Sequence, residues 1–337
     1  MPLAELHLHI EGTLEPETIV EFAGRNALRL PDKDIDALRA RYEFTDLQSF
    51  LDLYYENMAT LRTRADFAEM TWRYAVTAAS QGVRHAEVFV DPQAHSARGI
   101  PAAVVLGGVA DGLARAEAEL GLTSGILVCV LRDRPIEEGR RMLDEALATG
   151  IPILGIGLDS AEVGHPPGQF APIFAAAREA GLHCVAHAGE EGPPAYIWEA
   201  LDVLGVERID HGVRCLENAA LVARLVADAI PLTVCPVSNV RLRVVDTLAD
   251  HPLRRMLDAG LRVTVNSDDP AYFGGYAGDN LERSRAALGL TDGQVRLLAA
   301  GAVELRERFQ RGTGARRDAG DDRPAGHGGA QVEAIVS

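Results

Sequence analysis

Two histidines separated by one residue, His7 and His9, lie in an alternating polar and apolar run at residues 5–10. Alternation with a period of two is typical of a β-strand, and side chains at positions i and i+2 leave a strand on the same face. Both imidazoles can therefore point at one position, and a divalent metal ion makes such convergence favourable. The turn expected at 11–13 ends the strand. The pair by itself predicts half of a metal site, because short motifs also occur by chance.

Three more predicted strands end in side chains that can bind a metal or move protons. His187, His211 and the pair Asp268–Asp269 come at the ends of three later apolar runs. In a barrel of parallel strands, functional side chains gather at the rim formed by the carboxyl ends. Imidazoles and a carboxylate suit Zn²⁺, with water completing the shell of a catalytic site. Lys33 is the only lysine and lies in an early insertion, so a carboxylated lysine cannot bridge two metals, and we expect one Zn²⁺ per subunit.

The same rim offers the groups that a hydrolysis needs. Zn²⁺ lowers the pKa of its water toward about 7 and makes a hydroxide nucleophile, which still requires a base, an acid and a grip on the substrate. His211 can be the base or the electrostatic partner of the hydroxide. Glu190, three residues after His187, can reach the substrate and would stay protonated as a general acid if burial raises its pKa. Asp268 and Asp269 diverge because they are sequential: one can bind the metal while the other accepts a hydrogen bond from the substrate.

These side chains need a scaffold that brings distant strand ends together. Short apolar or β-branched runs alternate with longer helical patterns such as 101–120 and 135–149. The runs that we expect to form strands are 3–9, 83–90, 124–131, 151–158, 182–187, 206–210, 230–235 and 261–266. Eight strands alternating with helices predict an α/β fold of the (β/α)8 TIM-barrel type. The alternative, an open doubly wound sheet, would favour a glycine-rich phosphate turn after the first strand, and the sequence has none there.

The chain of 337 residues is long enough for one large domain, and we divide it into a barrel at 1–311 and a tail at 312–337. A helical insertion at about 14–80 follows the first strand. Its apolar residues either pack on the barrel or form a lid over a pocket. The tail is rich in Gly, Ala, Arg and Asp without periodicity, and we expect it to be disordered.

The composition narrows the range of partners. Lys and Arg number 33 against 49 Asp and Glu, a net charge of −16. Such a chain should be repelled by phosphate backbones and anionic membrane surfaces, so we expect no nucleic-acid or membrane partner. The four cysteines form no CxxC motif and are expected to be buried thiols. No apolar run approaches the roughly 20 residues of a membrane span, and a cytoplasmic location follows as the expectation. The sequence does not indicate the oligomeric state.

Four blocks contain the residues singled out above: HLHIEGT at 7–13, HAGEEGPP at 187–194, DHG at 210–212 and NSDDPAYFGGY at 266–276. Together they resemble the adenosine/adenine deaminase family of mononuclear zinc (β/α)8 barrels. The resemblance extends from Glu5 to about Phe309. Only four residues precede Glu5, fewer than family members usually have, so the chain is expected to start late.

The resemblance implies a role for each site residue. It implies that the zinc ion is held by His7, His9, His187 and Asp268. It further implies that Glu190 protonates the ring nitrogen next to the attacked carbon and that His211 assists the hydroxide. Asp269 would bind N7 of a purine, so the implied partner is a small purine molecule.

The strings GLDSAEVGHPP at 157–167 and HAGEEGPPAYIWEAL at 187–201 resemble the adenine deaminase branch, which acts on the free base. Adenosine deaminases carry an aspartate for ribose recognition where Glu11 stands, and a glycine that helps to bind N3 near Glu162. We therefore expect Glu11 and Glu162 to close the pocket where ribose would lie, and Gly189 to contact the substrate as well.

The predicted reaction is the zinc-dependent hydrolysis of adenine to hypoxanthine and ammonia. One alternative is a deaminase of adenosine or another 6-aminopurine nucleoside, and a second, from another class, is a non-catalytic binding barrel. Tyr272 and Phe273 either wall the purine pocket or pack their loop. His95 and His251 are expected in loops or on the surface.

Overall fold

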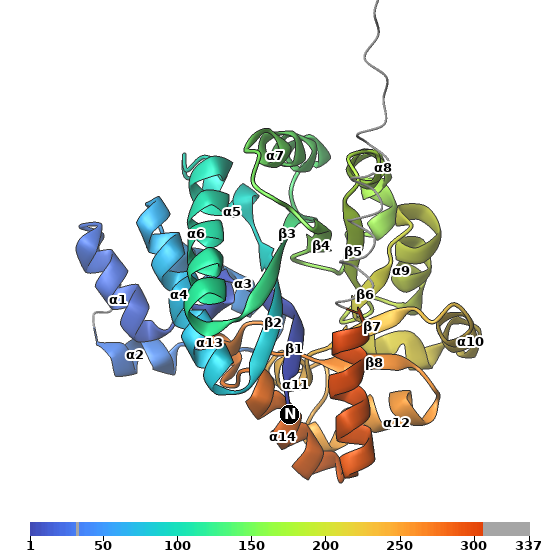
Figure 1. Ribbon diagram of the computed structural model, residues 1–337. Helices are drawn as coiled ribbons and strands as arrows, with labels where there is room; N and C mark the ends of the chain where they lie inside the picture. Colours follow the sequence, from blue (N-terminus) through green and yellow to red (C-terminus); the bar gives the residue numbers. More distant parts are fainter. Residues whose placement is uncertain (32–33, 306–337) are drawn as a thin grey trace, which may run out of the picture.

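A computed structural model describes residues 1–31 and 34–305, and the predicted tail at 312–337 lies outside them. Its eight strands are all parallel, and each pairs with the next one along the chain. The strands are β1 (Leu3–His9), β2 (Val83–Val90), β3 (Thr123–Leu131), β4 (Gly155–Asp159), β5 (His183–Ala188), β6 (Arg208–His211), β7 (Pro231–Val234) and β8 (Arg262–Val265). The predicted (β/α)8 barrel is confirmed (Figure 1).

The barrel closes between β1 and the segment that follows β8. The backbone N–H of His9 donates to the carbonyl oxygen of Asp268 (3.0 Å), and the N–H of Asp268 donates to the carbonyl of His7 (3.2 Å). One layer below, the side chain of Asn266 accepts a hydrogen bond from the N–H of Leu6 (2.9 Å). The closure therefore places the first and last functional segments of the sequence side by side.

Helices cover the outside of the barrel (Figure 1). Those between or after strands include α4 (Arg64–Ser80), α6 (Ala102–Leu120), α7 (Ile136–Ala148), α8 (Ala171–Glu179), α10 (Ala219–Ala227), α12 (Leu253–Asp258) and α14 (Ala277–Leu288). Four short helices begin with proline in the segments that follow β2, β5, β7 and β8: α5 (Pro92–Ser96), α9 (Pro194–Glu199), α11 (Pro236–Arg241) and α13 (Pro270–Phe273). Single turns are η1 (Glu11–Thr13), η2 (Pro167–Phe170), η3 (Ala200–Leu204), η4 (Val213–Glu217) and η5 (Leu248–Asp250).

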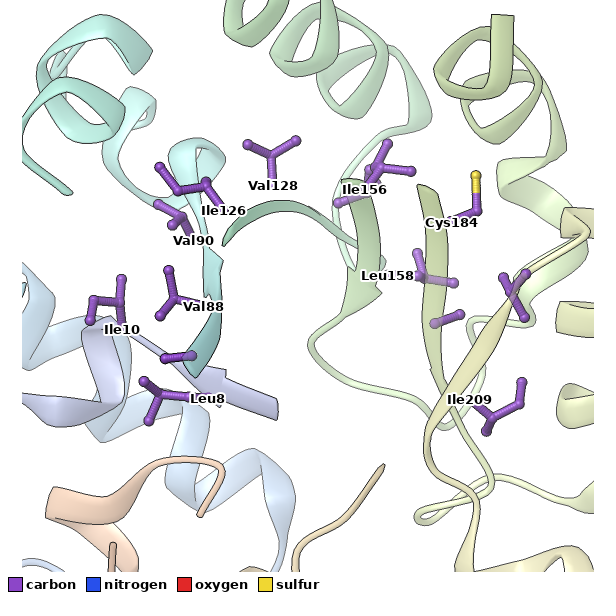
Figure 2. Packing of buried hydrophobic residues seen from close by; sticks show 14 of the residues in the cluster. Leu8, Ile10, Val88, Val90, Ile126, Val128, Ile156, Leu158, Cys184 and Ile209 are labelled. Atoms are coloured by element: carbon purple, nitrogen blue, oxygen red, sulfur yellow. The ribbon is translucent and has the colours of Figure 1, made fainter. Parts of the chain in front are cut away.

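The main core lies between the strands and the outer helices (Figure 2). Alternate strand residues such as Leu8, Val88 and Ile156 point to this layer and are fully buried. The other set points into the barrel, where Phe89 and Val185 belong to a small apolar cluster. Because His7 and His9 have the same parity as this inward set, the β1 strand itself aims both imidazoles into the barrel.

The insertion after β1 adds three helices before α4, namely α1 (Pro16–Arg25), α2 (Ile35–Ala40) and α3 (Leu47–Met58). Helix α3 starts with a capping box in which Asp46 and Ser49 exchange side-chain and backbone hydrogen bonds. Its apolar residues join Tyr272 and Phe273 in a second core cluster. Tyr272 stacks on Tyr42 with ring centroids 4.7 Å apart. These aromatic residues therefore pack α13 against the insertion.

All four cysteines are buried and free, as expected. Among residues 1–31 and 34–305, no helix combines the length and the apolar character that crossing a membrane requires.

Candidate active site

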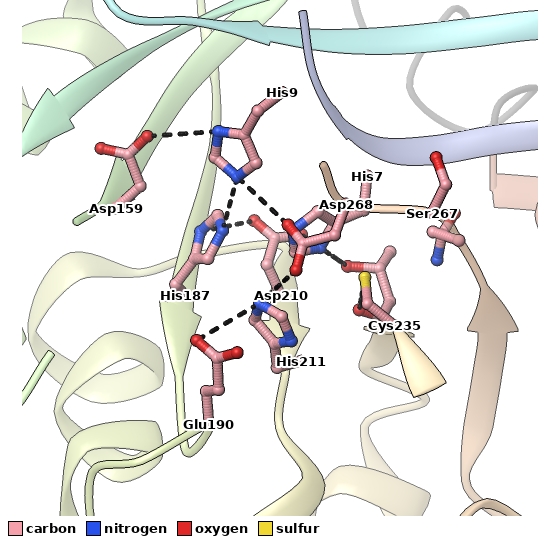
Figure 3. Close-up of polar contacts among 12 residues, drawn as sticks. His7, His9, Asp159, His187, Glu190, Asp210, His211, Cys235, Ser267 and Asp268 are labelled. Carbon is pink, nitrogen blue, oxygen red and sulfur yellow. Dashed lines mark hydrogen bonds and ion pairs between the residues drawn. The ribbon is translucent and has the colours of Figure 1, made fainter. Parts of the chain in front are cut away.

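Three imidazoles and one carboxylate converge at the carboxyl ends of β1, β5 and β8 (Figure 3). Nε2 of His7 lies 3.2 Å from Oδ1 of Asp268, and Nε2 of His9 lies 3.5 Å from the same oxygen. Nε2 of His187 lies 3.1 Å from Nε2 of His9. All four residues are buried. The structure thus brings together the four residues for which the sequence implied a metal.

The other ring nitrogen of each histidine faces an oxygen atom of a residue on another strand. Nδ1 of His7 contacts Oγ1 of Thr233 at 2.9 Å, and Nδ1 of His9 faces Oδ2 of Asp159 at 3.6 Å. Nδ1 of His187 lies 3.8 Å from Oδ2 of Asp210. Partners of this kind fix ring orientation in metal sites, because they leave the second nitrogen free to bind.

Asp210 is itself held by a buried network inside the barrel. Its Oδ1 accepts from Nε of Arg208 (2.9 Å) and from the hydroxyl of Thr233 (2.7 Å). Arg208 also donates to Glu87. Strand pairing aligns His187 with Asp210, which explains why this carboxylate reaches the ring of His187 from the neighbouring strand.

The donor set fits a divalent metal ion. Burial lowers the pKa of His9 to about 4, against the opposing effect of Asp268, and burial followed by the neighbouring His7 lowers the pKa of His187 well below its ordinary value. Both rings are therefore neutral at pH 7, as a ligand must be. Nε2 of His7 is buried without a hydrogen-bond partner. A cation at this point would satisfy an atom that the described residues leave unpaired.

Glu190 and His211 lie beside this cluster. Nε2 of His211 is 3.5 Å from Oε2 of Glu190 and 3.7 Å from Oδ2 of Asp268. Burial, followed by the negative charge of Asp268, raises the pKa of Glu190 well above its ordinary value. A raised pKa favours the protonated form of a carboxyl group, which can donate its proton.

Asn239 and His251, which the sequence did not point to, orient this pair. The amide nitrogen of Asn239 lies 3.4 Å from both Oε1 of Glu190 and Nδ1 of His211. Nδ1 of His251 accepts from the N–H of Leu253 (3.1 Å), so its Nε2 donates to Oδ1 of Asn239 (3.1 Å). His251 lies in a loop between η5 and α12, as expected, but the loop is not at the surface, since His251 is only 3% exposed.

Asp269 lies at the pocket wall next to the predicted metal ligands. Its Oδ1 is buried without a hydrogen-bond partner among the described residues, so it is open to a ligand. A Cβ added at Gly12 would lie 2.1 Å from this oxygen. Gly12 therefore leaves the space that the side chain of Asp269 occupies, and a larger residue there would clash with it.

The loop that carries Glu190 is held by Glu162. Oε1 of Glu162 accepts from the N–H of Gly189 (2.6 Å), and Oε2 accepts from the N–H groups of Glu190 (3.1 Å), Glu191 (2.8 Å) and Gly192 (2.8 Å). Neither Glu162 nor Gly189 is among the residues that line the pocket. Because four backbone donors occupy this carboxylate, its contacts support the loop rather than the substrate contact that we expected.

Glu11 is likewise absent from the residues that line the pocket. Its Oε1 accepts from the N–H of Asp91 (3.2 Å) and from Nε2 of His95 (3.0 Å), whose Nδ1 accepts from Arg98. Glu11 and His95 are fully buried, so the expectation of a surface position for His95 is wrong. The structure does not bring Glu11 to the pocket wall, where we expected it to exclude ribose.

The remaining pocket wall comes from α3 and from two acidic residues. Leu47, Phe50, Leu51, Tyr54 and Tyr55 of α3 line the pocket. Asp91, directly after β2, and Asp159, at the end of β4, line it as well. Their places at strand ends were the signal that could have identified them, because the same rule had singled out His187 and Asp268.

Three residues of the pocket have a backbone conformation that L-residues rarely adopt. His211 has φ +63° and Asp268 has φ +66°, and Ser160 at the pocket wall has φ +70°. Each such residue costs about 1–3 kcal/mol and persists only where the surroundings hold it. Three of the six described non-glycine residues with positive φ line this one pocket, which supports its assignment as the functional site.

A (β/α)8 barrel with a histidine and aspartate cluster at its carboxyl rim is the architecture of a metal-dependent hydrolase. The chain belongs to the adenosine deaminase family, whose family model matches residues 2–306.

Several relatives within this family have a more specific name. An adenine deaminase of Streptomyces coelicolor is 60% identical over 299 residues, which cover 89% of this chain and 88% of the relative. An adenine deaminase of Rhodospirillum rubrum is 53% identical, with 90% and 91% of the two chains covered.

Solved structures give the same picture. The crystal structure of an adenine deaminase from Arthrobacter aurescens is 53% identical and has a TM-score of 0.89, covering 94% of this chain and 99% of its own. An amidohydrolase from Burkholderia ambifaria with bound zinc is 27% identical and has a TM-score of 0.84, covering 96% and 92%.

Proposed function

We propose that this chain catalyses the hydrolytic deamination of adenine to hypoxanthine and ammonia. One zinc ion per subunit would be held by His7, His9, His187 and Asp268. The observation that carries the proposal is the convergence of three imidazoles and the carboxylate of Asp268 next to a buried carboxyl group, Glu190, in a pocket. The names of relatives with 50–60% identity supply the substrate.

Zinc bound at this cluster supplies a water of lowered pKa, and hence a nucleophile at neutral pH. The chain's own groups do the rest. His211, 3.7 Å from Oδ2 of Asp268, is placed to assist the nucleophile through Nε2. The contact of Nδ1 with the amide of Asn239 keeps this ring fixed.

Glu190 holds the proton that the purine ring needs. Its raised pKa favours the neutral, protonated carboxyl group, which would donate its proton to ring nitrogen N1 and increase the electrophilicity of C6. The 6-amino group of the base is then protonated and leaves C6 as ammonia. Burial, followed by the negative charge of Asp268, raises the pKa of Asp269 well above its ordinary value, so its carboxyl group would carry a proton and donate a hydrogen bond to N7 on the other ring of the base. Its free Oδ1 lies at the same wall of the pocket.

The roof formed by α3 excludes water from this chemistry. Phe50, Leu51 and Tyr54 present apolar and aromatic surface to the pocket, and a dry site strengthens the electrostatic contacts of Glu190 and Asp269 with the base. A planar, uncharged purine suits such a pocket, since most of the surface of the purine is an aromatic ring face.

Parallel kinetics with adenine and adenosine test the proposal. The zinc-loaded chain should release ammonia from adenine with a much higher kcat/KM than from adenosine. A large preference for adenosine, or no ammonia from adenine, would contradict the proposed substrate.

A further inference from the structure

Two carboxyl groups in the pocket are not used by the mechanism above. Asp91 and Asp159 both line the pocket, and each is 2% exposed. Together with His9 they place three polar atoms within 4.8 Å of one another. Oδ1 of each aspartate is buried and has no hydrogen-bond partner among the described residues. Buried acceptors of this kind are costly unless a ligand supplies the donor.

The pair lies across His9 from the predicted metal cluster. Nε2 of His9 faces Asp268, while its Nδ1 faces Oδ2 of Asp159 at 3.6 Å (Figure 3). Ser160, the next residue, contacts the hydroxyl of Tyr55 in the roof at 3.0 Å. The two carboxyls thus occupy a separate end of the pocket, between β2, β4 and α3.

The chemistry of this end selects a hydrogen-bond donor. If adenine places its C6 amino group beside the metal cluster, as the proposed function requires, its other donor is the N–H of the imidazole ring. That N–H is on N9 in the common tautomer, at the side of the base away from C6. We propose that Asp91 and Asp159 form a subsite that accepts a hydrogen bond from N9–H and thereby selects the free base.

A substituent on N9 removes this donor and puts carbon next to two buried acceptors. A site built to bind an N–H group rejects an analogue that lacks it strongly, because its own polar groups are then left unpaired. The subsite therefore assigns base-against-nucleoside selection to Asp91 and Asp159, in place of Glu11 and Glu162.

Asp91→Leu tests the subsite, since leucine has a similar shape and no acceptor. Asp91 is preferred to Asp159 because Asp159 contacts His9. We would measure kcat/KM and equilibrium binding for adenine, 9-methyladenine and adenosine, with zinc content as a check on the metal site. Asp91→Asn keeps one acceptor oxygen, and Asp144→Asn removes an exposed carboxylate as the matched control.

The wild-type chain should prefer adenine to 9-methyladenine by about 100-fold or more. Asp91→Leu should reduce that ratio at least about 10-fold, mainly through the KM for adenine, with Asp91→Asn in between and zinc content unchanged. The Asp144→Asn variant should keep the wild-type ratio.

Three results would overturn the subsite. The first is an adenine to 9-methyladenine ratio that neither variant changes. The second is a loss confined to adenosine, which would mean that the pair binds ribose hydroxyls. The third is a second metal ion per subunit that Asp91→Leu removes. If the wild-type chain does not deaminate adenine, the proposed function fails, but the binding ratio of the two bases still tests the subsite separately.

Discussion

We predict that the conservative change Glu162→Gln greatly lowers kcat, because the carboxylate of Glu162 holds the loop that carries Glu190. Its two oxygens accept four backbone N–H groups, three on Oε2 and one on Oε1. In the better orientation of the glutamine amide, the nitrogen replaces Oε1, so the N–H of Gly189 meets another donor. An orphaned buried N–H costs about 1–3 kcal/mol. The three remaining bonds lose their charge assistance, about 1 kcal/mol each, for a total of about 4–6 kcal/mol.

The lost hydrogen bonds all hold the loop that carries Glu190. The substitution should therefore displace Glu190 and lower the turnover number. A displacement of about 1 Å costs about 100-fold in rate, and kcat for adenine should fall by about this factor while zinc content stays at the wild-type level. The assay follows kcat, KM and bound zinc together with thermal unfolding, and Glu117→Gln on the surface is the matched control. A variant that loses thermal stability but keeps kcat within about twofold would refute the loop argument, because the carboxylate would then serve the fold alone.

Three further changes give separate expectations. Glu190→Gln removes the proton donor and should lower kcat by about 10²–10⁴-fold with zinc retained, and a variant with near-normal kcat would remove the acid role. Asp268→Ala should lower zinc content, since Oδ1 of Asp268 faces both His7 and His9; full occupancy would argue against its role as a ligand. His251 has a pKa lowered by burial from 6.5 to about 4, so the unfolded chain binds more protons between these values. The stability contributed by neutral His251 is complete above pH 6.5 and lost as the pH falls to about 4. The difference in unfolding free energy between wild type and His251→Gln should therefore shrink by about 3 kcal/mol from pH 7 to pH 4, and a pH-independent difference would contradict a neutral buried ring.

The sequence predicted those parts of the molecule that follow a local rule. Alternation placed His7 and His9 on one face, and the barrel rule brought His187 and Asp268 to the same rim. Eight apolar runs were enough to predict eight parallel strands, because in such a sheet each strand is buried on both faces.

Residues whose position depends on loop geometry were less predictable. Glu11 and Glu162 are close to the site in sequence, yet they bind His95 and the 189–192 backbone. Nothing local in the sequence shows which way a side chain turns after a strand ends. His251 reaches the site through Asn239, a contact that only the packing of α11 and the following segment creates.

Zinc titration of the metal-free chain, with adenine as the substrate, tests the central claim most directly. The chain stripped of metal by a chelator should release no ammonia. Activity should return in proportion to added zinc and reach its maximum at one zinc ion per subunit. Full activity without metal, or a maximum at two ions per subunit, would contradict a single zinc centre formed by His7, His9, His187 and Asp268.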